Sequence, residues 1–231
     1  PPSVIMVLYG ILTETDIAKL FIAGIVPGIL GVVLYNLAVT FVTRFNADAG
    51  PPGRRFSWPE RWRALTGVWE ILVLFILVIG GIYIGFFTPT EAAGVGATGS
   101  FLAVVARRRI SLGDIFESLH ESAILSANIF MVPIGALIFS NFLNMTAMPK
   151  ILGGMVTESN LAPMYVMLAM ILIYVLLGCI LDSISMILLT VPIFFPLVVV
   201  MEFDPVWFGI IVVVVTEISL ITPPIGMNIF V

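Results

Sequence analysis

The fold of this chain is constrained most by long apolar segments that a few short polar stretches interrupt. Two interruptions are the most informative. Residues 178–185 contain a carboxylate and two hydroxyls, and residues 222–226 contain a double proline. Polar, helix-broken backbone occurs at membrane depth only where protein surrounds it or where it lines a cavity. The two breaks therefore predict two loops that meet to hold something polar, which we interpret as ions and a substrate.

The composition places the chain in one class and argues against several others. Of its 231 residues, 60% are hydrophobic and only 10% are charged, which is typical of an all-α polytopic membrane protein. A single cysteine, Cys179, excludes an internal disulfide, and a single histidine, His120, argues against a histidine metal site. There is no basic aromatic surface for nucleic acid, and no HExxH or Gly-x-Ser-x-Gly motif. We therefore expect no enzyme and no nucleic-acid partner.

Arginine clusters orient the predicted helices. Half of the Lys and Arg residues lie in residues 44–64, and three consecutive arginines occupy 107–109. By the positive-inside rule both clusters are cytoplasmic, and two crossings between them agree with this. The expected order is a half-helix over 1–12, a transmembrane helix and cytoplasmic loop over 13–64, transmembrane helices and an interfacial helix over 65–162, and a hairpin with a broken helix over 163–231.

Within this order, breaks and caps predict finer detail. A span over 20–43 should bend near Pro27. Residues 111–123 have the spacing of an interfacial amphipathic helix that precedes a crossing over 124–145. Short helices over 163–178 and 186–200, joined by the polar tip, indicate a re-entrant hairpin, and a further helix over 206–221 breaks at 222–224. The chain resumes as a helix over 225–231.

Two cap sequences predict helix starts. Thr88, Pro89 and Glu91 fit a capping box, and Asp204 before Pro205 fits an N-cap. Ala92, Gly96 and Ser100 then form a stripe of small residues that predicts close packing. A direct ion contact of Glu91 is the alternative to its capping role.

An internal repeat is also present. Pro1-Pro2-Ser3 and Pro223-Pro224 are each followed by an apolar half-helix. Hydrophobic segments broken at corresponding positions of two halves indicate a transporter binding site. The match is short, so coincidence is the competing interpretation.

Five ordered motifs resemble the large membrane subunit of TRAP (tripartite ATP-independent periplasmic) transporters. Residues 85–93 are similar to its Gly-x-x-Thr-Pro-Thr-Glu-Ala-Ala signature. Further similarities lie in residues 181–196, 204–209, 222–226 and 1–28. The resemblance covers essentially the whole chain and suggests the C-terminal half of such a subunit, without its first hairpin and last helix.

The resemblance implies an inverted-repeat transporter of the elevator type in a bacterial or archaeal inner membrane. It implies sodium-coupled uptake of a small organic acid, such as a C4-dicarboxylate or sialic acid. It also implies an extracytoplasmic solute-binding protein and a small membrane subunit as partners, with sodium as the coupling ion and no other cofactor. The alternative is another sodium–carboxylate carrier of similar plan that works without a binding protein. A channel or assembly subunit is a third, less favoured class.

The candidate site residues supply the oxygen ligands that sodium prefers. An intramembrane carboxylate indicates function, so Asp182 leads, and we assign sodium contacts to Asp182 and Thr222. The competing interpretation is that Asp182 only caps the following helix. Glu217 is either a second coupling carboxylate or a residue paired within the scaffold. The full set expected to bind ions or substrate is Gly178, Asp182, Ser183, Ser185, Thr222, Pro223, Gly226, Pro2 and Ser3.

Overall fold

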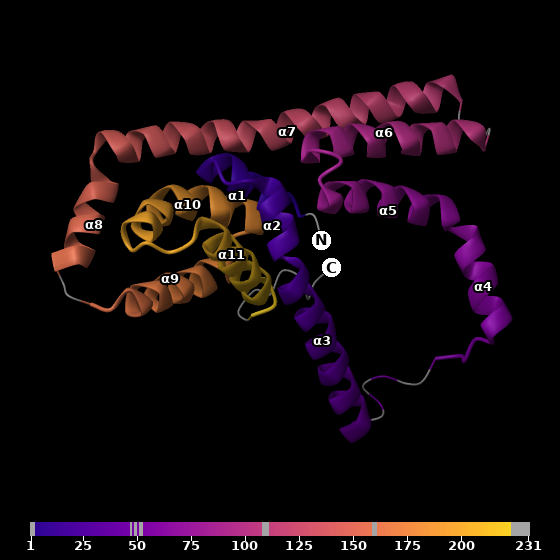
Figure 1. Cartoon of the computed structure of the whole chain (residues 1–231), viewed down its shortest axis with the longest axis horizontal. Helices are drawn as coiled ribbons and strands as arrows, with labels where there is room; N and C mark the ends of the chain where they lie inside the picture. The colour runs from indigo at the N-terminus through magenta and orange to yellow at the C-terminus, as the bar shows by residue number, and fades with distance from the viewer. Residues whose placement is uncertain are drawn as a thin grey trace. The chain divides into compact units, whose positions relative to one another are not determined.

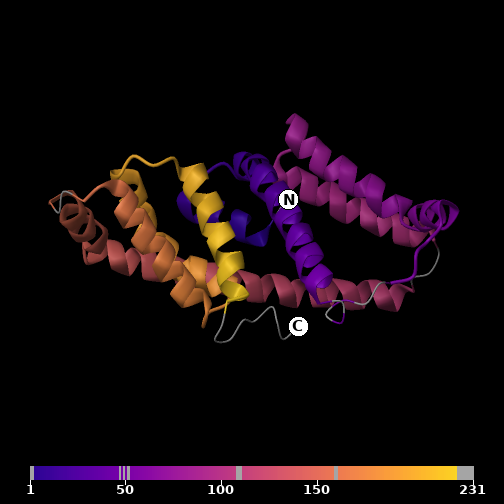
Figure 2. The ribbon, with the colours of Figure 1, turned by 90° about the horizontal axis from the view of Figure 1, so that it is seen from below.

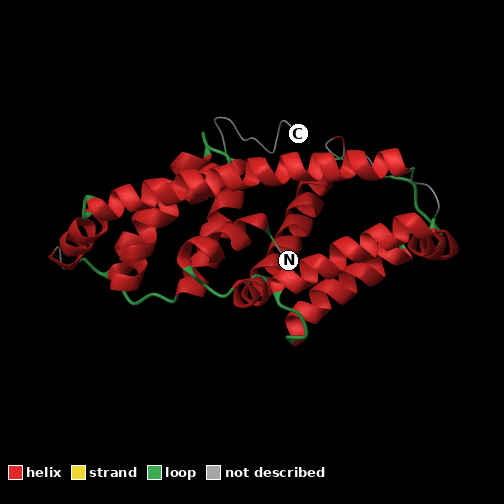
Figure 3. Cartoon of the chain, turned by 90° about the horizontal axis from the view of Figure 1, so that it is seen from above, coloured by secondary structure: helices red, strands yellow, loops and turns green. Residues whose placement is uncertain are grey.

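The structure is a computed structural model that describes residues 3–46, 48, 50, 53–107, 111–158 and 161–222. Every regular element among these residues is a helix (Figure 3). The expected all-α class is therefore confirmed. The described residues form two compact units, one from Pro1–Gly24 and Phe116–Val231 and the other from Ile25–Ile115. Each unit is described separately below.

The first unit is built around α10 and α11. Helix α10 (Ser183–Val200) packs against α1 (Val4–Thr13), α8 (Met148–Glu158) and α9 (Pro163–Gly178). Helix α11 (Pro205–Leu220) packs against α10, α9, α1 and α2 (Ile17–Ala23), as Figure 1 shows. Most of α7 (Leu112–Met145) also belongs to this unit, but the helix is exposed along nearly all its length. The short apolar helices from both ends of the chain thus share one core.

Tyr9 lies at the centre of this core. Its side chain is fully buried between the rings of Phe195 and Phe208, with centroids 6.2 Å away in each case. Its hydroxyl donates a 2.7 Å hydrogen bond to the carbonyl oxygen of Pro205, the first residue of α11. Gly209 lies directly against the ring, since a Cβ there would come within 2.6 Å of Tyr9 Cε1. Tyr9 therefore fixes α1 against the start of α11.

The second unit contains α3 (Ile25–Phe45), α4 (Trp58–Gly67), α5 (Trp69–Ile84) and α6 (Pro89–Ala106). Helices α5 and α6 pack against each other. The turn between them begins at Gly85, whose φ of 79° lies in the left-handed region that favours glycine. At the other end of the pair, Arg107 and Glu70 form an ion pair of 2.7 Å.

Several segments have the length and composition of membrane spans. Among the described residues these are Ile17–Phe45, Leu112–Met145 and Ser183–Val200, and the bent pair α4–α5 would make a fourth. Helices α1, α9 and α11 are apolar but only 10 to 16 residues long. About 20 residues are needed to span hydrocarbon, so this mixture of long and short helices fits a polytopic protein with interrupted segments.

The interruption expected near Pro27 is present at Gly24, where α2 has ended at Ala23 and α3 has not yet begun. In a continuous helix the N–H of residue 27 would bond to the carbonyl of Ala23, and proline has no N–H to donate. Helix α2 accordingly ends at Ala23, and Pro27 falls in the first turn of α3, where N–H groups have no intrahelical partner. A helix break near Pro27 is therefore confirmed, and a bend of the span at this point stays a prediction.

Other boundaries also differ from expectation. Residues 111–123 do not form a separate helix, since α7 runs unbroken from Leu112 to Met145 through Pro133. An interfacial position for its first part stays a prediction. Helix α10 begins at Ser183, and its 18 residues make it longer than the half-helix expected over 186–200. The re-entrant hairpin and the four expected sequence divisions likewise stay predictions.

Both predicted cap sequences are confirmed. The backbone N–H of Thr88 donates to Glu91 Oε2 at 2.8 Å, and the Glu91 N–H donates to Thr88 Oγ1 at 3.3 Å. Asp204 Oδ1 accepts from the Trp207 N–H at 2.8 Å, with Pro205 at the first helical position. In the small-residue stripe, Ala92 is fully buried, whereas Ser100 is exposed.

Candidate functional site

The tip between α9 and α10 is a four-residue turn, residues 179–182. The N–H of Leu181 donates to the carbonyl of Leu177 at 2.8 Å, which closes the end of α9. Asp182 then caps α10, and its Oδ2 accepts from the N–H groups of Ile184 and Ser185 at 3.1 and 3.2 Å. A carboxylate at a helix N-terminus also meets the positive end of the helix dipole. The capping role weighed for Asp182 is therefore present.

The cap leaves Asp182 accessible. Its side chain is exposed, and besides the two N–H groups that donate to Oδ2 the Ser185 side chain also hydrogen-bonds this carboxylate. A carboxylate has about four acceptor sites, so it can still bind a cation. Ser183 and Ser185 lie beside it at the start of α10, and both are half-buried. The tip thus places a carboxylate and two hydroxyl residues at one helix start.

The end of α11 is the second part of the site. Helix α11 ends at Leu220, and the Thr222 hydroxyl donates to the carbonyl of Ile218 at 2.7 Å. One turn earlier, the fully buried Ser219 donates to the carbonyl of Thr216 at 2.7 Å. Pro223 and Gly226 lie outside the described residues. The hydroxyls at this end therefore satisfy carbonyls within the last turns of their own helix.

The two parts meet at Gly178 and Ser219. Gly178, the last residue of α9, is buried, and a Cβ there would collide with the side chain of Ser219. This contact lies four residues before Asp182 and three before Thr222. Figure 2 shows the turn between α9 and α10 and the end of α11 at the same end of the first unit. The segments that lead into the two breaks are therefore in contact at Gly178 and Ser219, and the convergence of the breaks themselves stays a prediction.

The remaining candidates are placed less closely. Ser3 precedes α1 as its N-cap residue and is half-buried, but its side chain makes no cap hydrogen bond. Pro2 lies outside the described residues. Glu217 is exposed on the face of α11 that also carries Val214 and Ile218. Whether Glu217 is a second coupling carboxylate or a residue paired within the scaffold therefore stays open. Glu91 has the capping role that was expected for it at the start of α6.

The site chemistry suits a hard monovalent cation better than a transition metal. Among the described residues, no group of three or more His, Cys, Asp or Glu side chains has an arrangement that suits a metal ion. The groups at hand are one carboxylate, several hydroxyls and backbone carbonyls at two helix ends, which are hard oxygen donors.

Two buried polar features were missed from sequence. Thr216 and Ser219 are fully buried on α11, and Thr216 Oγ1 has no hydrogen-bond partner in the described part of the chain. The hydroxyls of Thr190 and Tyr174 form a 2.8 Å hydrogen bond between α10 and α9. The available signal was the spacing of 216 and 219 ahead of Thr222, which places them on one helix face.

Comparison with known proteins gives the family. The family model described as "Tripartite ATP-independent periplasmic transporter, DctM component" matches residues 1–231. A C4-dicarboxylate TRAP transporter large permease protein from Pseudomonas aeruginosa is 38% identical over 100% of this chain and 54% of its own length. An ectoine/5-hydroxyectoine large permease from Ruegeria pomeroyi is 35% identical, with the same coverage.

A third relative extends the range of solutes. A sialic acid TRAP transporter large permease protein from Vibrio cholerae is 30% identical over 100% of this chain and 54% of its own length. The chain thus spans about half the length of these curated relatives, all of which are permease subunits and not enzymes. That this part is the C-terminal half stays a prediction. Taken with the family match over its whole length, the chain belongs to the DctM family of tripartite ATP-independent periplasmic transporter components.

Proposed function

We propose that this chain is part of a large permease subunit that takes up a small organic acid in symport with sodium. The main support is the contact of Gly178 with Ser219, which brings the Asp182 tip and the end of α11 to one place. Helix ends left at membrane depth supply carbonyl oxygens for a cation and N–H groups for an anion. The substrate class follows relatives whose names specify C4-dicarboxylate and sialic acid.

In this proposal Asp182 has two roles at once. Its Oδ2 holds the start of α10, and the exposed carboxylate contributes negative charge to a sodium ion shared with oxygens near Thr222. The organic acid binds next to the cation, so each ligand reduces the cost of desolvating the other. Ser183, Ser185 and Ser3, with Pro2, Pro223 and Gly226, would complete the polar lining.

The transporter works as an assembly in the inner membrane of a bacterium or archaeon. A solute-binding protein delivers the acid from outside, and a small membrane subunit supports the scaffold. The first unit would move its site across the membrane in the manner of an elevator, because its helices share one core around Tyr9 and α10. Family membership supports both partners and this location.

The direct test is uptake by the complete transporter reconstituted in vesicles. Uptake of a labelled organic acid should require an inward sodium gradient and should fall to background when potassium replaces sodium. Equal uptake in both salts would refute sodium coupling. Uptake at the full rate without the binding protein would instead support a carrier that works alone.

Asp182 has a matched control in the same chain. Asp182→Asn keeps a good N-cap residue but removes the charge, and Asp204→Asn makes the same change at the cap of α11. We expect Asp182→Asn to raise the sodium concentration needed for half-maximal uptake and Asp204→Asn to leave it unchanged. Equal effects of the two variants would reduce Asp182 to a capping residue.

A further inference from the structure

Helix α4 carries an apolar stripe that is exposed. Trp58, Trp62 and Leu65 recur at the three- and four-residue spacing that puts side chains on one helix face. All three are exposed, the tryptophans by 70% and 64%. Large apolar side chains in a continuous exposed stripe indicate a surface that binds something apolar.

Arginines surround this stripe. Arg61 lies beside the stripe, Arg63 lies on the opposite, polar side of the helix, and Arg54 and Arg55 precede the helix. Arg61 lies over the ring of Trp58, with 5.0 Å between its Cζ and the ring centroid. This contact holds a cation at the level of an indole ring, as at the boundary between lipid tails and headgroups.

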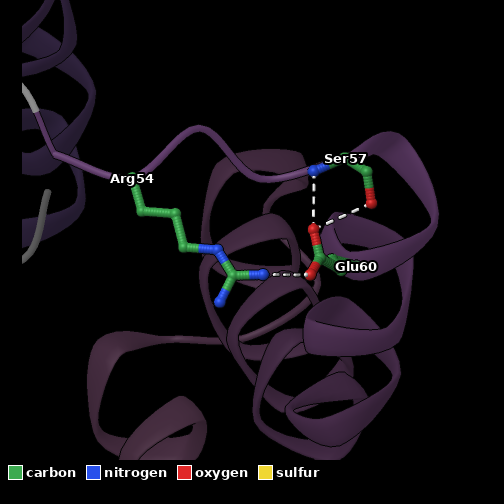
Figure 4. Close-up of polar contacts among 3 residues, drawn as sticks. All are labelled: Arg54, Ser57 and Glu60. Atoms are coloured by element: carbon green, nitrogen blue, oxygen red, sulfur yellow. Dashed lines mark hydrogen bonds and ion pairs between the residues drawn. The ribbon is translucent and has the colours of Figure 1, made fainter.

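The first turn of α4 is held by contacts of Glu60 with Ser57 and Arg54. The Ser57 N–H donates to Glu60 Oε2 at 2.7 Å, and Arg54 pairs with Glu60 Oε1 at 3.1 Å (Figure 4). These bonds fix the first turn and use one of the four arginines. The Ser57 N–H also holds the pKa of the Glu60 carboxyl below its usual range, so Glu60 stays charged. Arg55, Arg61 and Arg63 remain as excess positive charge.

The direction of α4 fits a surface position. Helices α4 and α5 are separated only by Val68 and are bent by 67° relative to each other. Apart from Glu70 in its first turn, α5 is apolar, so its 16 residues would enter the bilayer while α4 turns toward the membrane plane. Trp69, at the start of α5, then lies at the same boundary.

We propose that α4 is a membrane-surface helix that binds anionic phospholipid, with its tryptophan stripe among the acyl chains and its arginines on the headgroup phosphates. An apolar stripe, a low overall hydrophobicity and arginines on the polar face and at its edge are the signature of such helices. A partner protein is the alternative occupant, because tryptophan and arginine are also enriched at protein interfaces. The excess positive charge next to the bend into the apolar helix α5 favours the lipid surface.

The test is hydrogen–deuterium exchange of the complete permease in lipid nanodiscs. One preparation contains phosphatidylcholine alone, and the other contains phosphatidylcholine mixed with phosphatidylglycerol. We expect the amides of residues 60–67 to exchange roughly tenfold more slowly in the anionic discs at low salt. In Arg61→Gln/Arg63→Gln the difference should shrink to roughly twofold. Glutamine keeps helix propensity, so the variant retains α4.

The charge-conserving variant Arg61→Lys/Arg63→Lys is the matched control and should keep most of the lipid effect. Exchange in α5 and α6 should stay the same in both discs and all variants, which would show that folding is intact. Equal exchange of α4 in both lipids would overturn the proposal. So would protection that appears only when the small membrane subunit is added, or protection that survives the glutamine changes. None of these measurements depends on transport.

Discussion

Gly178→Ala tests the contact on which the site geometry depends. The new Cβ would collide with Ser219 Oγ and would lie 3.3 Å from Met186 Sδ. Ser219 is fully buried and its hydroxyl is held by the Thr216 carbonyl, so it has little room to move. Adding a methyl group to a packed site of this kind costs about 1–3 kcal/mol. We expect the free energy of unfolding to fall by that amount and α9 to separate from α11.

The control is Gly154→Ala in the exposed part of α8. A Cβ at Gly154 would meet nothing within 4 Å, so this variant should be about 0.5–1 kcal/mol more stable than the parent. Equilibrium unfolding of the purified permease measures the free energy of unfolding of both variants, Gly178→Ala and Gly154→Ala. The double variant Gly178→Ala/Ser219→Gly removes the colliding side chain and should recover part of the loss. If Gly178→Ala is as stable as Gly154→Ala, the close approach of α9 and α11 is refuted.

Two further changes test the packing around the site. Tyr9→Phe keeps the buried ring but loses the hydrogen bond to the Pro205 carbonyl, so the free energy of unfolding should fall by about 1 kcal/mol. Tyr165→Phe, its control at an exposed position, should leave the free energy of unfolding unchanged. Thr88→Ala removes the N-cap of α6 and should also lower the free energy of unfolding by about 1 kcal/mol, measured by equilibrium unfolding. If the loss is no larger than that of Thr98→Ala inside the helix, the capping box does not stabilise α6.

Local chemistry explains which features were predictable. The Thr88–Glu91 box and the Asp204 cap depend on residues within one helical turn, and both formed as expected. That the helix breaks near Pro27 was also predictable, because proline has no N–H to donate to the carbonyl four residues before it. The position of the break depends on which carbonyl loses its donor, and that carbonyl belongs to Ala23, one turn before the proline.

Features that depend on long-range packing were harder to predict. Periodicity placed a break before residue 124, yet α7 continues through it, and neither Pro133 nor the polar first turns end the helix. Ser219 and Thr216 look like ordinary hydroxyls in an apolar helix, and only the approach of Gly178 gives Ser219 a role in the site. Tyr9 was likewise invisible, because its partner carbonyl is 196 residues away in sequence.

The most direct test of the central claim is sodium-dependent stability. A cation held between the Asp182 tip and the end of α11 must stabilise the folded permease, by about 2.7 kcal/mol at a hundred times its dissociation constant. The thermal unfolding temperature of the purified permease should therefore rise with sodium but not with potassium. Asp182→Asn should abolish the rise, and Asp204→Asn should preserve it. A rise that persists in Asp182→Asn would contradict the account.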